Sequence, residues 1–279
     1  MRWGKWGAGF ETRDYQNMIE ACLGIGINQF DHADIYGNYT TENEFGKVLK
    51  QVPSLRTEIE IITKCGIQLP GVNSAFTDKS YNTSQLHIIQ SVEKSLRNFN
   101  TDYIDLLLLH RPDPLMNPYE IAAAIDSLKQ AGKIKHFGVS NFKPSQCKLL
   151  QSTTAVAYNQ IEISIIMLDA FINGTLDQCI YDKIIPMAWS PLGGGKLTDA
   201  ASARYRSITN AAFALSEKYG YPANDILISW LANHPAGIVP ILGTTKIDRL
   251  SAANKALHLQ MDRADWYRLW TASTGEEIA

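Results

Sequence analysis

Short apolar segments alternate with amphipathic segments along the whole of this 279-residue chain. Runs such as Ile59–Gly66 and Tyr103–His110 have the length and composition of buried strands, and segments such as Thr83–Phe99 repeat apolar residues at helical spacing. Alternation sustained in this way predicts a parallel sheet with helices outside it. The two forms of such a fold are a closed α/β barrel and an open, doubly wound sheet.

The remaining elements continue the same alternation. A strand ending near Asp31 follows the first helix, and Gln68–Asn82 shows no period and predicts a long loop. The further strands are predicted at Ile134–Ser140, Val156–Ile161, Ile184–Trp189 and Ile238–Leu242, and the further helices at Arg13–Gly24, Thr41–Lys50, Asn117–Ala131, Pro144–Gln151, Gly174–Asp182, Thr209–Tyr219, Asp225–Asn233, Lys246–Leu257 and Asp262–Ala272. The pattern contains seven strands, one fewer than a closed eight-stranded barrel.

The glycine distribution favours the barrel over the open sheet. An open sheet that binds a dinucleotide carries a GxGxxG segment after its first strand. The only glycine cluster here, Gly193–Gly195, comes late in the chain and follows Pro191. A length of 279 residues suits one large α/β barrel, so we expect a single domain over residues 1–279.

Composition excludes several other classes of protein. The chain is 45% hydrophobic and 19% charged, and its net charge of −2 gives no long-range attraction to nucleic acid or to an anionic membrane. The four cysteines show no CxxC pair, which predicts free thiols in a reducing compartment. Neither a secretory signal nor an apolar run of membrane-spanning length is present in the sequence, so we expect a cytoplasmic protein.

Four polar residues stand at, or one step beyond, the carboxyl ends of predicted strands: Asp31, Lys64, His110 and Asn141. In a barrel these ends meet at one mouth, where barrel enzymes keep their chemistry. Tyr36 follows the first of these strands closely enough to join them. Taken singly, each side chain also has a structural interpretation, such as a strand cap, a packed ring or a buried aliphatic stem.

Side-chain alternation places Asp31 and Ala33 on one face of their strand, and His32 and Asp34 on the other. His32 and Asp34 therefore do not join Asp31 as a set of metal ligands. No HxH or HExxH segment supplies further ligands in the sequence. We predict that the protein has no metal site.

Tyr36, Lys64, Asp31 and His110 together have the composition of an acid catalyst. A phenol with its ordinary pKa of about 10 is a poor proton donor at pH 7, and an ammonium placed beside a phenol lowers that pKa. The ammonium needs a carboxylate to stay charged in a cleft of low dielectric. A histidine can then direct a hydrogen bond to an incoming carbonyl oxygen. Since no activated serine or cysteine is evident, hydride from a nicotinamide would complete the set.

At these positions the chain resembles the aldo-keto reductases over essentially its whole length. The family's catalytic aspartate and tyrosine match Asp31 and Tyr36, its lysine in a Thr-Lys-x-Gly setting matches Lys64, and the histidine that ends a leucine-rich strand matches His110. The HRPDP and SPLGGG segments are most similar to the bacterial oxidoreductase branch related to YdhF. The resemblance implies a (β/α)8 TIM barrel that binds NADP(H) across its carboxyl face without a Rossmann domain.

The resemblance also implies a set of cofactor contacts. In the family's GxSNF segment the serine and asparagine hold the nicotinamide carboxamide, which the glutamine of an NQ(I/V)E segment also contacts, and an aromatic ring stacks on the nicotinamide. The residues that match these and neighbouring contacts are Ser140, Asn141, Gln160, Trp189, Ser190, Leu192, Gly194, Gly243, Thr244 and Thr245.

Cofactor choice depends on the segment Gly243–Arg249, in which a strand end is followed by a helix start. A helix N-terminus is a ready anion site, and Lys246 and Arg249 add two cations, of which arginine can fork onto a phosphate. This segment resembles the family's clamp on the 2′-phosphate, so NADPH is favoured over NADH. The alternative interpretation is an ordinary basic helix start.

The chain departs from the family pattern in two places. Where the family has Glu-Asn to hold the adenine, the chain has Ala252-Ala253, with Asn254 one position late, which predicts a weaker adenine contact. The family also places a strand ending in Gly-Thr before the segment that Met1–Gly4 resembles, and this strand is missing here. An open seam exposes two strand edges, so we expect a poorly stable or inactive barrel unless another segment fills the gap.

The sequence therefore predicts an NADPH-dependent reductase of aldehyde and ketone carbonyls. Tyr36 and His110 contact the small-molecule substrate, and Trp3, Trp6 and the loop over residues 68–82 line its mouth, because large aromatic surfaces suit a pocket rim. One alternative is a non-catalytic, NADP-binding barrel that acts as a redox-sensing, channel-associated subunit. The other is an unrelated metal-assisted barrel hydrolase. The substrate itself is set by loops, whose sequence does not encode pocket shape.

Overall fold

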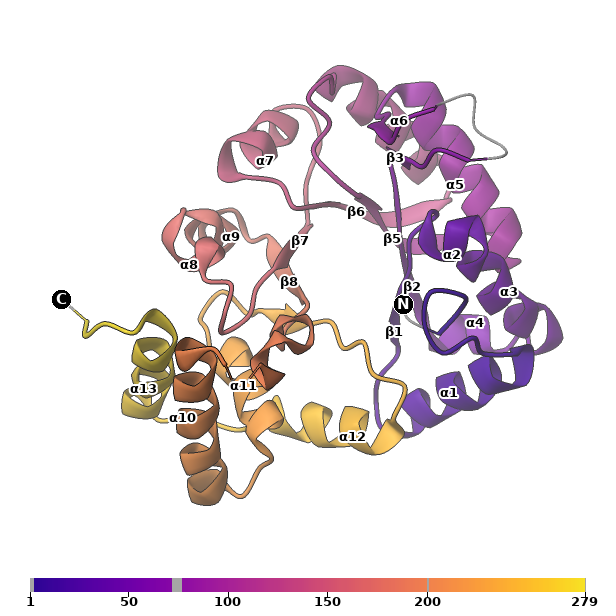
Figure 1. Ribbon diagram of the computed structural model, residues 1–279. Helices are drawn as coiled ribbons and strands as arrows, with labels where there is room; N and C mark the ends of the chain where they lie inside the picture. Colours follow the sequence, from indigo (N-terminus) through magenta and orange to yellow (C-terminus); the bar gives the residue numbers. More distant parts are fainter. Residues whose placement is uncertain (1–2, 72–76, 200, 279) are drawn as a thin grey trace. The chain divides into compact units, whose positions relative to one another are not determined.

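The computed structural model describes residues 3–71, 77–199 and 201–278 (Figure 1). The chain divides into two compact units, Met1–Asn159 and Gln160–Ala279. All seven strands predicted for the main sheet are present among the described residues, as β1, β2 and β5 to β9. The expectation that a further strand is missing ahead of them stays a prediction, as does the single domain.

The first unit alternates strands and helices. Its elements are α1 (Thr12–Gly24), β1 (Gln29–Asp31), α2 (Tyr36–Tyr39), α3 (Thr41–Gln51), α4 (Leu55–Glu58), β2 (Glu60–Cys65), β3 (Ile67–Gln68), β4 (Ser80–Tyr81), α5 (Gln85–Phe99), β5 (Ile104–Leu109), α6 (Pro118–Gln130), β6 (Ile134–Ser140) and α7 (Pro144–Gln151), and β7 (Tyr158–Glu162) crosses into the second unit. The short helices α2 and α4 were not predicted, because four residues are too few to show a helical period.

Local sequence explains where the longer helices of this unit begin. Ser84 precedes α5 and its hydroxyl accepts a hydrogen bond from the amide of His87 at 3.4 Å. Asn117 precedes α6 and accepts from the amide of Tyr119, with Pro118 at the first helical position. Both are standard helix starts, since a capping side chain satisfies one of the free amides of the first turn and proline there loses no bond.

Four parallel strands of the first unit lie in the order β1-β2-β5-β6. The register pairs Asp31 with Ile62 and Lys64 with Leu108. Every residue of β5 is buried, which confirms the prediction of a strand covered on both faces. Because the strands are parallel, their carboxyl ends share one edge, and the predicted catalytic side chains come from that edge.

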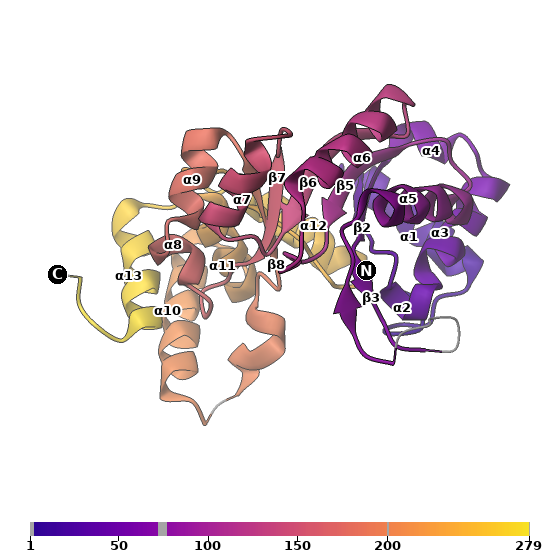
Figure 2. The ribbon, with the colours of Figure 1, turned by 90° about the horizontal axis from the view of Figure 1, so that it is seen from above.

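The helices α3 and α5 pack side by side (Figures 1 and 2). Phe45 in α3 and Phe99 in α5 are buried between apolar neighbours, and their rings lie 6.1 Å apart. Helix α5 also packs against β2.

One prediction for the first unit was wrong. Within the segment expected to be a loop without secondary structure, β3 and β4 form a two-stranded antiparallel sheet that pairs Ile67 with Tyr81 and Gln68 with Ser80. Strands of two residues are too short to produce an alternating pattern, so no sequence signal indicated them. Residues 72–76 of the expected loop lie outside the described residues.

The second unit is mostly helical. Its elements are α8 (Asp169–Ile172), α9 (Thr175–Asp182), β8 (Ile185–Trp189), a 3₁₀ helix (Gly193–Thr198), α10 (Ala203–Tyr219), α11 (Ala223–Ala232), β9 (Val239–Pro240), α12 (Ile247–Ala256) and α13 (Arg263–Thr274). Strand β9 is shorter than predicted and pairs in parallel with β8. Helix α10 begins at Ala203, earlier than the predicted Thr209, because Ser202 caps it by accepting from the amide of Tyr205.

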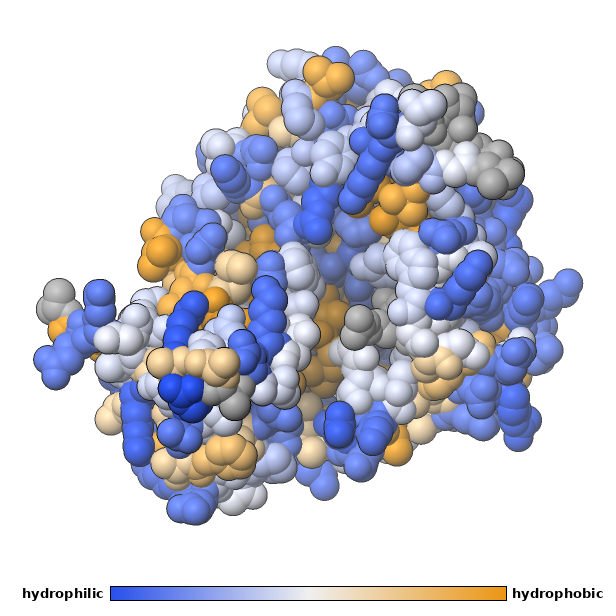
Figure 3. Space-filling view, viewed as in Figure 1, coloured by the Kyte–Doolittle hydropathy of each residue, from blue (hydrophilic) through white to orange (hydrophobic). Residues whose placement is uncertain are grey.

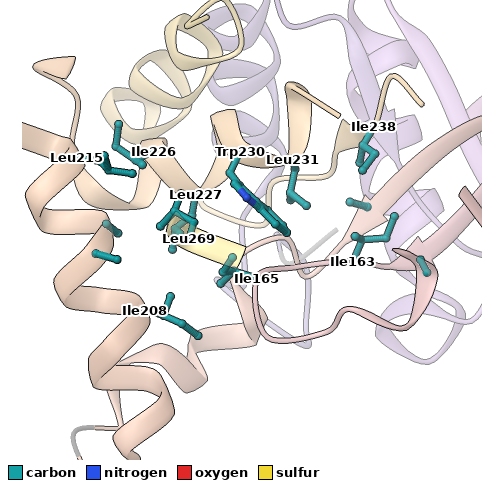
Figure 4. Packing of buried hydrophobic residues seen from close by; sticks show 14 of the residues in the cluster. Ile163, Ile165, Ile208, Leu215, Ile226, Leu227, Trp230, Leu231, Ile238 and Leu269 are labelled. Atoms are coloured by element: carbon teal, nitrogen blue, oxygen red, sulfur yellow. The ribbon is translucent and has the colours of Figure 1, made fainter. Parts of the chain in front are cut away.

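Trp230 is the largest side chain in the core of the second unit, and Figure 4 shows it among aliphatic side chains that include Leu227, Leu231 and Ile165. Its ring stacks on that of Trp266 at 4.9 Å, and each indole N–H donates to the backbone carbonyl of the other residue at 3.0–3.1 Å. Trp266 therefore packs α13 against α11.

Hydrophilic side chains cover much of the face shown in Figure 3. Within the described ranges, no helix combines the length and the apolar character needed to cross a lipid bilayer.

Candidate active site

Lys64 and Asp31 form a buried ion pair at the carboxyl edge of the first unit. The ammonium of Lys64 donates to both carboxylate oxygens of Asp31 at 2.8 Å and to the backbone carbonyl of His32 at 2.7 Å. It lies 3.4 Å from the hydroxyl of Tyr36. The two strands that carry this pair are hydrogen-bonded neighbours, so the pairing follows from the fold rather than from a flexible approach of two surface groups.

The lysine is charged although only 1% of it is exposed. Burial lowers the pKa of Lys64, but the Asp31 carboxylate and the Tyr36 phenol more than offset this, so that the pKa lies above its ordinary value. An ammonium in a site of low dielectric is stable only with such partners.

Tyr36 is the first residue of α2, in the segment that follows β1. Its ring lies 5.8 Å from that of His110 and 6.3 Å from that of Trp6. Gly37 has φ +64°, and a Cβ there would lie 2.6 Å from Oγ1 of Thr41. Only glycine fits this position, because both the backbone conformation and the space exclude a side chain. The sharp turn after Tyr36 therefore depends on Gly37.

His110 presents a neutral imidazole to this group. Burial, followed by the charges of Lys64, Arg111 and Lys79, lowers the pKa of His110 to about 2. Its backbone amide donates to the carbonyl of Cys65 at 2.8 Å, which ties the end of β5 to the end of β2. Within the described residues, its buried Nδ1 has no hydrogen-bond partner.

His32 lies on the opposite face of its strand, as predicted. Its ring packs against Phe45 at 4.6 Å and Phe99 at 5.0 Å, and burial keeps its pKa well below the ordinary value. Throughout the part of the chain that the structure covers, no cluster of three or more histidine, cysteine, aspartate or glutamate side chains has a geometry that could hold a metal ion.

The two tryptophans expected at the substrate mouth lie in different environments. Trp3 is 6% exposed and packs among Phe10, Tyr15 and Phe30 at 5.6–5.9 Å. Trp6 is 49% exposed and lies beside Tyr36. Trp6 therefore offers an accessible indole beside Tyr36, and the expectation that Trp3 contacts the substrate stays a prediction.

Two of the predicted cofactor residues belong to the first unit. Ser140 is the last residue of β6 and is buried, and the side-chain amide of Asn141 donates to its hydroxyl at 2.8 Å. Asn141 has φ +61°, a left-handed conformation that asparagine tolerates better than most residues. The amide of Asn141 is thereby held at the carboxyl edge, next to the end of β6.

The other predicted cofactor residues belong to the second unit. Gln160 is buried in β7, while Trp189 and Ser190 are half-buried at the end of β8. Leu192 is half-buried and Gly194 is exposed, ahead of and within the 3₁₀ helix. The amide of Ile241 donates to the carbonyl of Ala188 at 2.8 Å, which brings the strand end that precedes Gly243 beside the strand end that carries Trp189.

The segment from Gly243 leads into the N-terminus of α12. Lys246 is the N-cap residue, and its amide donates to the hydroxyl of Thr244 at 3.2 Å. Lys246 and Arg249 are both exposed, and Thr245 is half-buried between them and Gly243. Two cations thus flank a helix start, together with the exposed Asp248.

A cavity of about 210 Å³ opens at the other ends of the strands in the first unit, away from Lys64. It is lined by Gln29, Glu60, Ile62, Asp105, Leu106, Lys135, His136 and Tyr158. None of the four predicted catalytic residues lines it. Barrel enzymes keep their chemistry at the carboxyl ends of the strands, so geometry and chemistry both favour the group around Tyr36 as the candidate active site.

The backbone carbonyl of His32 is a part of this site that sequence reasoning missed. It accepts the shortest of the hydrogen bonds given above for the Lys64 ammonium. A carbonyl is common to every residue type, so no sequence signal could have identified it.

Comparisons with known proteins identify the family of this chain. A family model described as the aldo/keto reductase family matches residues 1–273. The chain is 45% identical to the oxidoreductase YcsN of Bacillus subtilis (strain 168) over 96% of this chain and 91% of that protein. It is 47% identical to a 6-dehydroglucose reductase of Agrobacterium fabrum (95% and 89%) and 41% identical to the oxidoreductase YdhF of Escherichia coli K12 (96% and 90%).

Solved structures agree on the fold. The thermostable aldo-keto reductase Tm1743, bound to the inhibitor epalrestat, superposes with a TM-score of 0.80 at 24% identity over 97% of this chain and 93% of that one. An aldo-keto reductase of Klebsiella pneumoniae in complex with NADPH gives 0.75 at 22% identity over 92% and 84%. The fold is therefore an α/β fold of the barrel type. By its sequence match over nearly the whole length, the chain belongs to the aldo/keto reductase family and is an NAD(P)H-dependent oxidoreductase.

Proposed function

We propose that the protein reduces aldehyde and ketone carbonyls to alcohols with NADPH, and that Tyr36 is the general acid. The observation that carries this proposal is the position of the Lys64 ammonium, 3.4 Å from the Tyr36 hydroxyl and paired with Asp31. A cation held beside a phenol stabilises the phenolate that remains when the proton leaves. Bound NADPH would supply the hydride.

Each residue of the site has one task in this mechanism. Tyr36 donates its proton to the carbonyl oxygen of the substrate. Lys64 stabilises the phenolate, and Asp31 keeps Lys64 charged and in place. His110, neutral and with Nδ1 buried, donates a hydrogen bond from Nε2 to the same oxygen and orients the carbonyl. Donors aimed at the oxygen where charge develops are the most effective form of such stabilisation.

The residues present fit NADP(H). We propose that Ser140, Asn141 and Gln160 hold the nicotinamide carboxamide and that Trp189 stacks on the ring. The proposed phosphate contacts are the backbone and side chains of Ser190, Leu192, Gly194, Gly243, Thr244, Thr245, Lys246 and Arg249. The two exposed cations at the start of α12 favour the extra phosphate of NADPH, and the Klebsiella structure with bound NADPH supports the same cofactor.

We further propose a sugar aldehyde as the substrate class. A relative 47% identical to this chain is a 6-dehydroglucose reductase. Trp6, half-exposed beside Tyr36, offers a flat apolar surface on which a pyranose ring can lie. We also propose that the fold is a (β/α)8 barrel. That this chain lacks the first strand of the barrel stays a prediction. Four free, buried thiols support the cytoplasm as its location.

The test is aldehyde-dependent oxidation of NADPH, with 4-nitrobenzaldehyde and a 6-aldehyde of glucose as substrates. We expect turnover with both, and a higher kcat/KM for the sugar aldehyde. NADPH binding, followed by quenching of tryptophan fluorescence, with no turnover of any aldehyde would instead support the non-catalytic sensor. Failure to bind NADPH would reject both interpretations.

A further inference from the structure

A carboxylate is buried behind the strand that carries Lys64. Glu42 lies in the first turn of α3 and is 1% exposed. Its Oε1 accepts from the hydroxyls of Thr63 at 2.7 Å and Ser95 at 2.9 Å, and its Oε2 accepts from the side-chain amide of Asn98 at 3.1 Å. Three donors on one buried carboxylate are a built arrangement, because burying a charged group is costly unless its oxygens are paired.

These bonds join three elements at one point. Glu42 belongs to α3, Thr63 to β2, and both Ser95 and Asn98 to α5. Helices α3 and α5 already pack side by side (Figures 1 and 2). Of the three bonds to Glu42, the one from Thr63 is the one that joins this carboxylate to β2.

Thr63 is the residue directly before Lys64. Successive side chains of a strand point to opposite faces, so Thr63 faces the helices while Lys64 faces Asp31 and Tyr36. The bond from Thr63 to Glu42 thus restrains the short piece of backbone from which the Lys64 side chain extends. The Lys64 carbonyl is held as well, by the amide of Asp34 at 3.0 Å.

The charges behind the strand fit this arrangement. Burial raises the pKa of Glu42, while the bonds from Thr63, Asn98 and Ser95 and the charge of Lys94 oppose that rise. Burial and the neighbouring Glu42 raise the pKa of Asp34 well above its ordinary value. Of these two carboxyls, Glu42 has the three donors that stabilise a negative charge.

We propose that Glu42 is a positioning residue: through Thr63 it holds the end of β2 so that the Lys64 ammonium stays within reach of the Tyr36 hydroxyl. The inference rests on the proposed function, in which that ammonium stabilises the phenolate. At 3.4 Å the contact is already at the outer limit of a hydrogen bond. A displacement of about 1 Å would remove it, and misplacement of that size is known to lower rates by about a hundredfold.

The decisive comparison is Thr63→Val against Ser95→Ala. Each variant removes one hydroxyl donor from the same Glu42 oxygen, but only Thr63 adjoins Lys64. We expect Thr63→Val to lower kcat at least tenfold with KM for NADPH unchanged, and Ser95→Ala to retain the kcat of the wild type. Both variants lose one buried bond, so their melting temperatures should fall by similar amounts. Equal kcat in the two variants would overturn the proposal.

Exchanging the carboxylate of Glu42 and the side-chain amide of Asn98 provides a second test. In Glu42→Gln, the new side-chain N–H donor faces the N–H donor of Asn98, so this hydrogen bond is lost. In the double variant Glu42→Gln/Asn98→Asp, the new aspartate accepts from the new glutamine, and the glutamine oxygen still accepts from Thr63. We expect the single variant to lose kcat and the double variant to recover most of it. No recovery in a double variant that folds and binds NADPH would count against a positioning role.

Tyr36→Phe separates this inference from the function on which it rests. If Tyr36→Phe keeps the turnover of the wild type, the proposed function fails, whatever Thr63→Val shows. If Tyr36→Phe is inactive while Thr63→Val and Ser95→Ala turn over equally, the function stands and the positioning role fails.

Discussion

The Lys64 ammonium donates to both carboxylate oxygens of Asp31 at 2.8 Å, from a strand directly beside the one that carries Asp31. The pair is buried, with 1% of the lysine side chain and 14% of the aspartate side chain exposed. It is the electrostatic centre of the proposed site, since the phenol, the imidazole and the carboxylate are all arranged around one ammonium.

Replacing Asp31 with alanine should leave Lys64 as a buried charge without its carboxylate. Loss of one partner of a buried pair typically costs about 3 kcal/mol or more, so we expect a fall of that size in the free energy of unfolding, measured by urea titration, and at least a hundredfold loss of kcat. Glu93→Ala is the control, because it removes the partner of Lys133 in a more exposed pair, worth at most about 1 kcal/mol. Equal losses in the two variants would contradict the account.

Replacing each of the two tryptophans near the start of the chain should have a different effect, one on substrate binding and the other on the free energy of unfolding. Trp6→Ala removes the proposed platform beside Tyr36, so KM for a sugar aldehyde should rise about tenfold while stability and NADPH binding stay as in the wild type. Trp3→Ala empties a buried aromatic cluster and should lower the free energy of unfolding by about 3 kcal/mol. A raised KM in Trp3→Ala, with an unchanged KM in Trp6→Ala, would reverse this assignment.

Cofactor preference should depend on the start of α12. Arg249→Ala removes one of two cations from the proposed 2′-phosphate contact, so KM for NADPH should rise at least tenfold while KM for NADH changes little. Lys255→Ala, in the last turn of the same helix, is the matched control and should leave both values unchanged. Steady-state kinetics with both cofactors measures the effect, and parallel changes for NADPH and NADH would argue against a 2′-phosphate contact.

Stability should fall as the pH falls below about 6.5, in part because of His32. Burial holds the pKa of His32 well below its ordinary value, so the unfolded chain binds a proton near pH 6.5 that the folded chain does not. Well above pH 6.5, His32 is neutral in both states and does not lower the free energy of unfolding. At pH 5.5, protonation of His32 in the unfolded chain lowers the free energy of unfolding by about 1.4 kcal/mol. His32→Leu should remove this share of the slope between pH 7.5 and pH 5.5, measured by urea unfolding.

The comparison of His32→Leu with the wild type removes the contribution of all other titrating groups. An unchanged slope in His32→Leu would show that the folded protein takes up the proton at His32 as readily as the unfolded chain.

The residues at the strand ends were predictable because charged and polar side chains are unusual in buried strands. Apolar runs that finish in Asp31, Lys64 or His110 stand out from sequence alone, and parallel strands necessarily bring such ends to one edge. The alternation of strand side chains placed Asp31 and His32 on opposite faces correctly, since the period of a strand is fixed by its backbone.

Other features depend on contacts that no local pattern records. Trp3 and Trp6 are both tryptophans in one glycine-rich turn, and only tertiary packing decides that Trp3 joins the core and Trp6 remains open. Strands β3 and β4 are too short to show a period. The role proposed for Glu42 rests on partners in two other elements, Thr63 and Ser95, so sequence position gave no reason to connect it with Lys64.

The most direct test of the central claim is the turnover of Tyr36→Phe in the presence of NADPH and an aldehyde at pH 7. The variant keeps the ring and loses only the hydroxyl, so NADPH should still quench tryptophan fluorescence as in the wild type. We predict a loss of kcat of about a thousandfold or more, since general acid catalysis contributes about 10²–10⁴-fold. Turnover within about threefold of the wild type would contradict the role of Tyr36 as the proton donor.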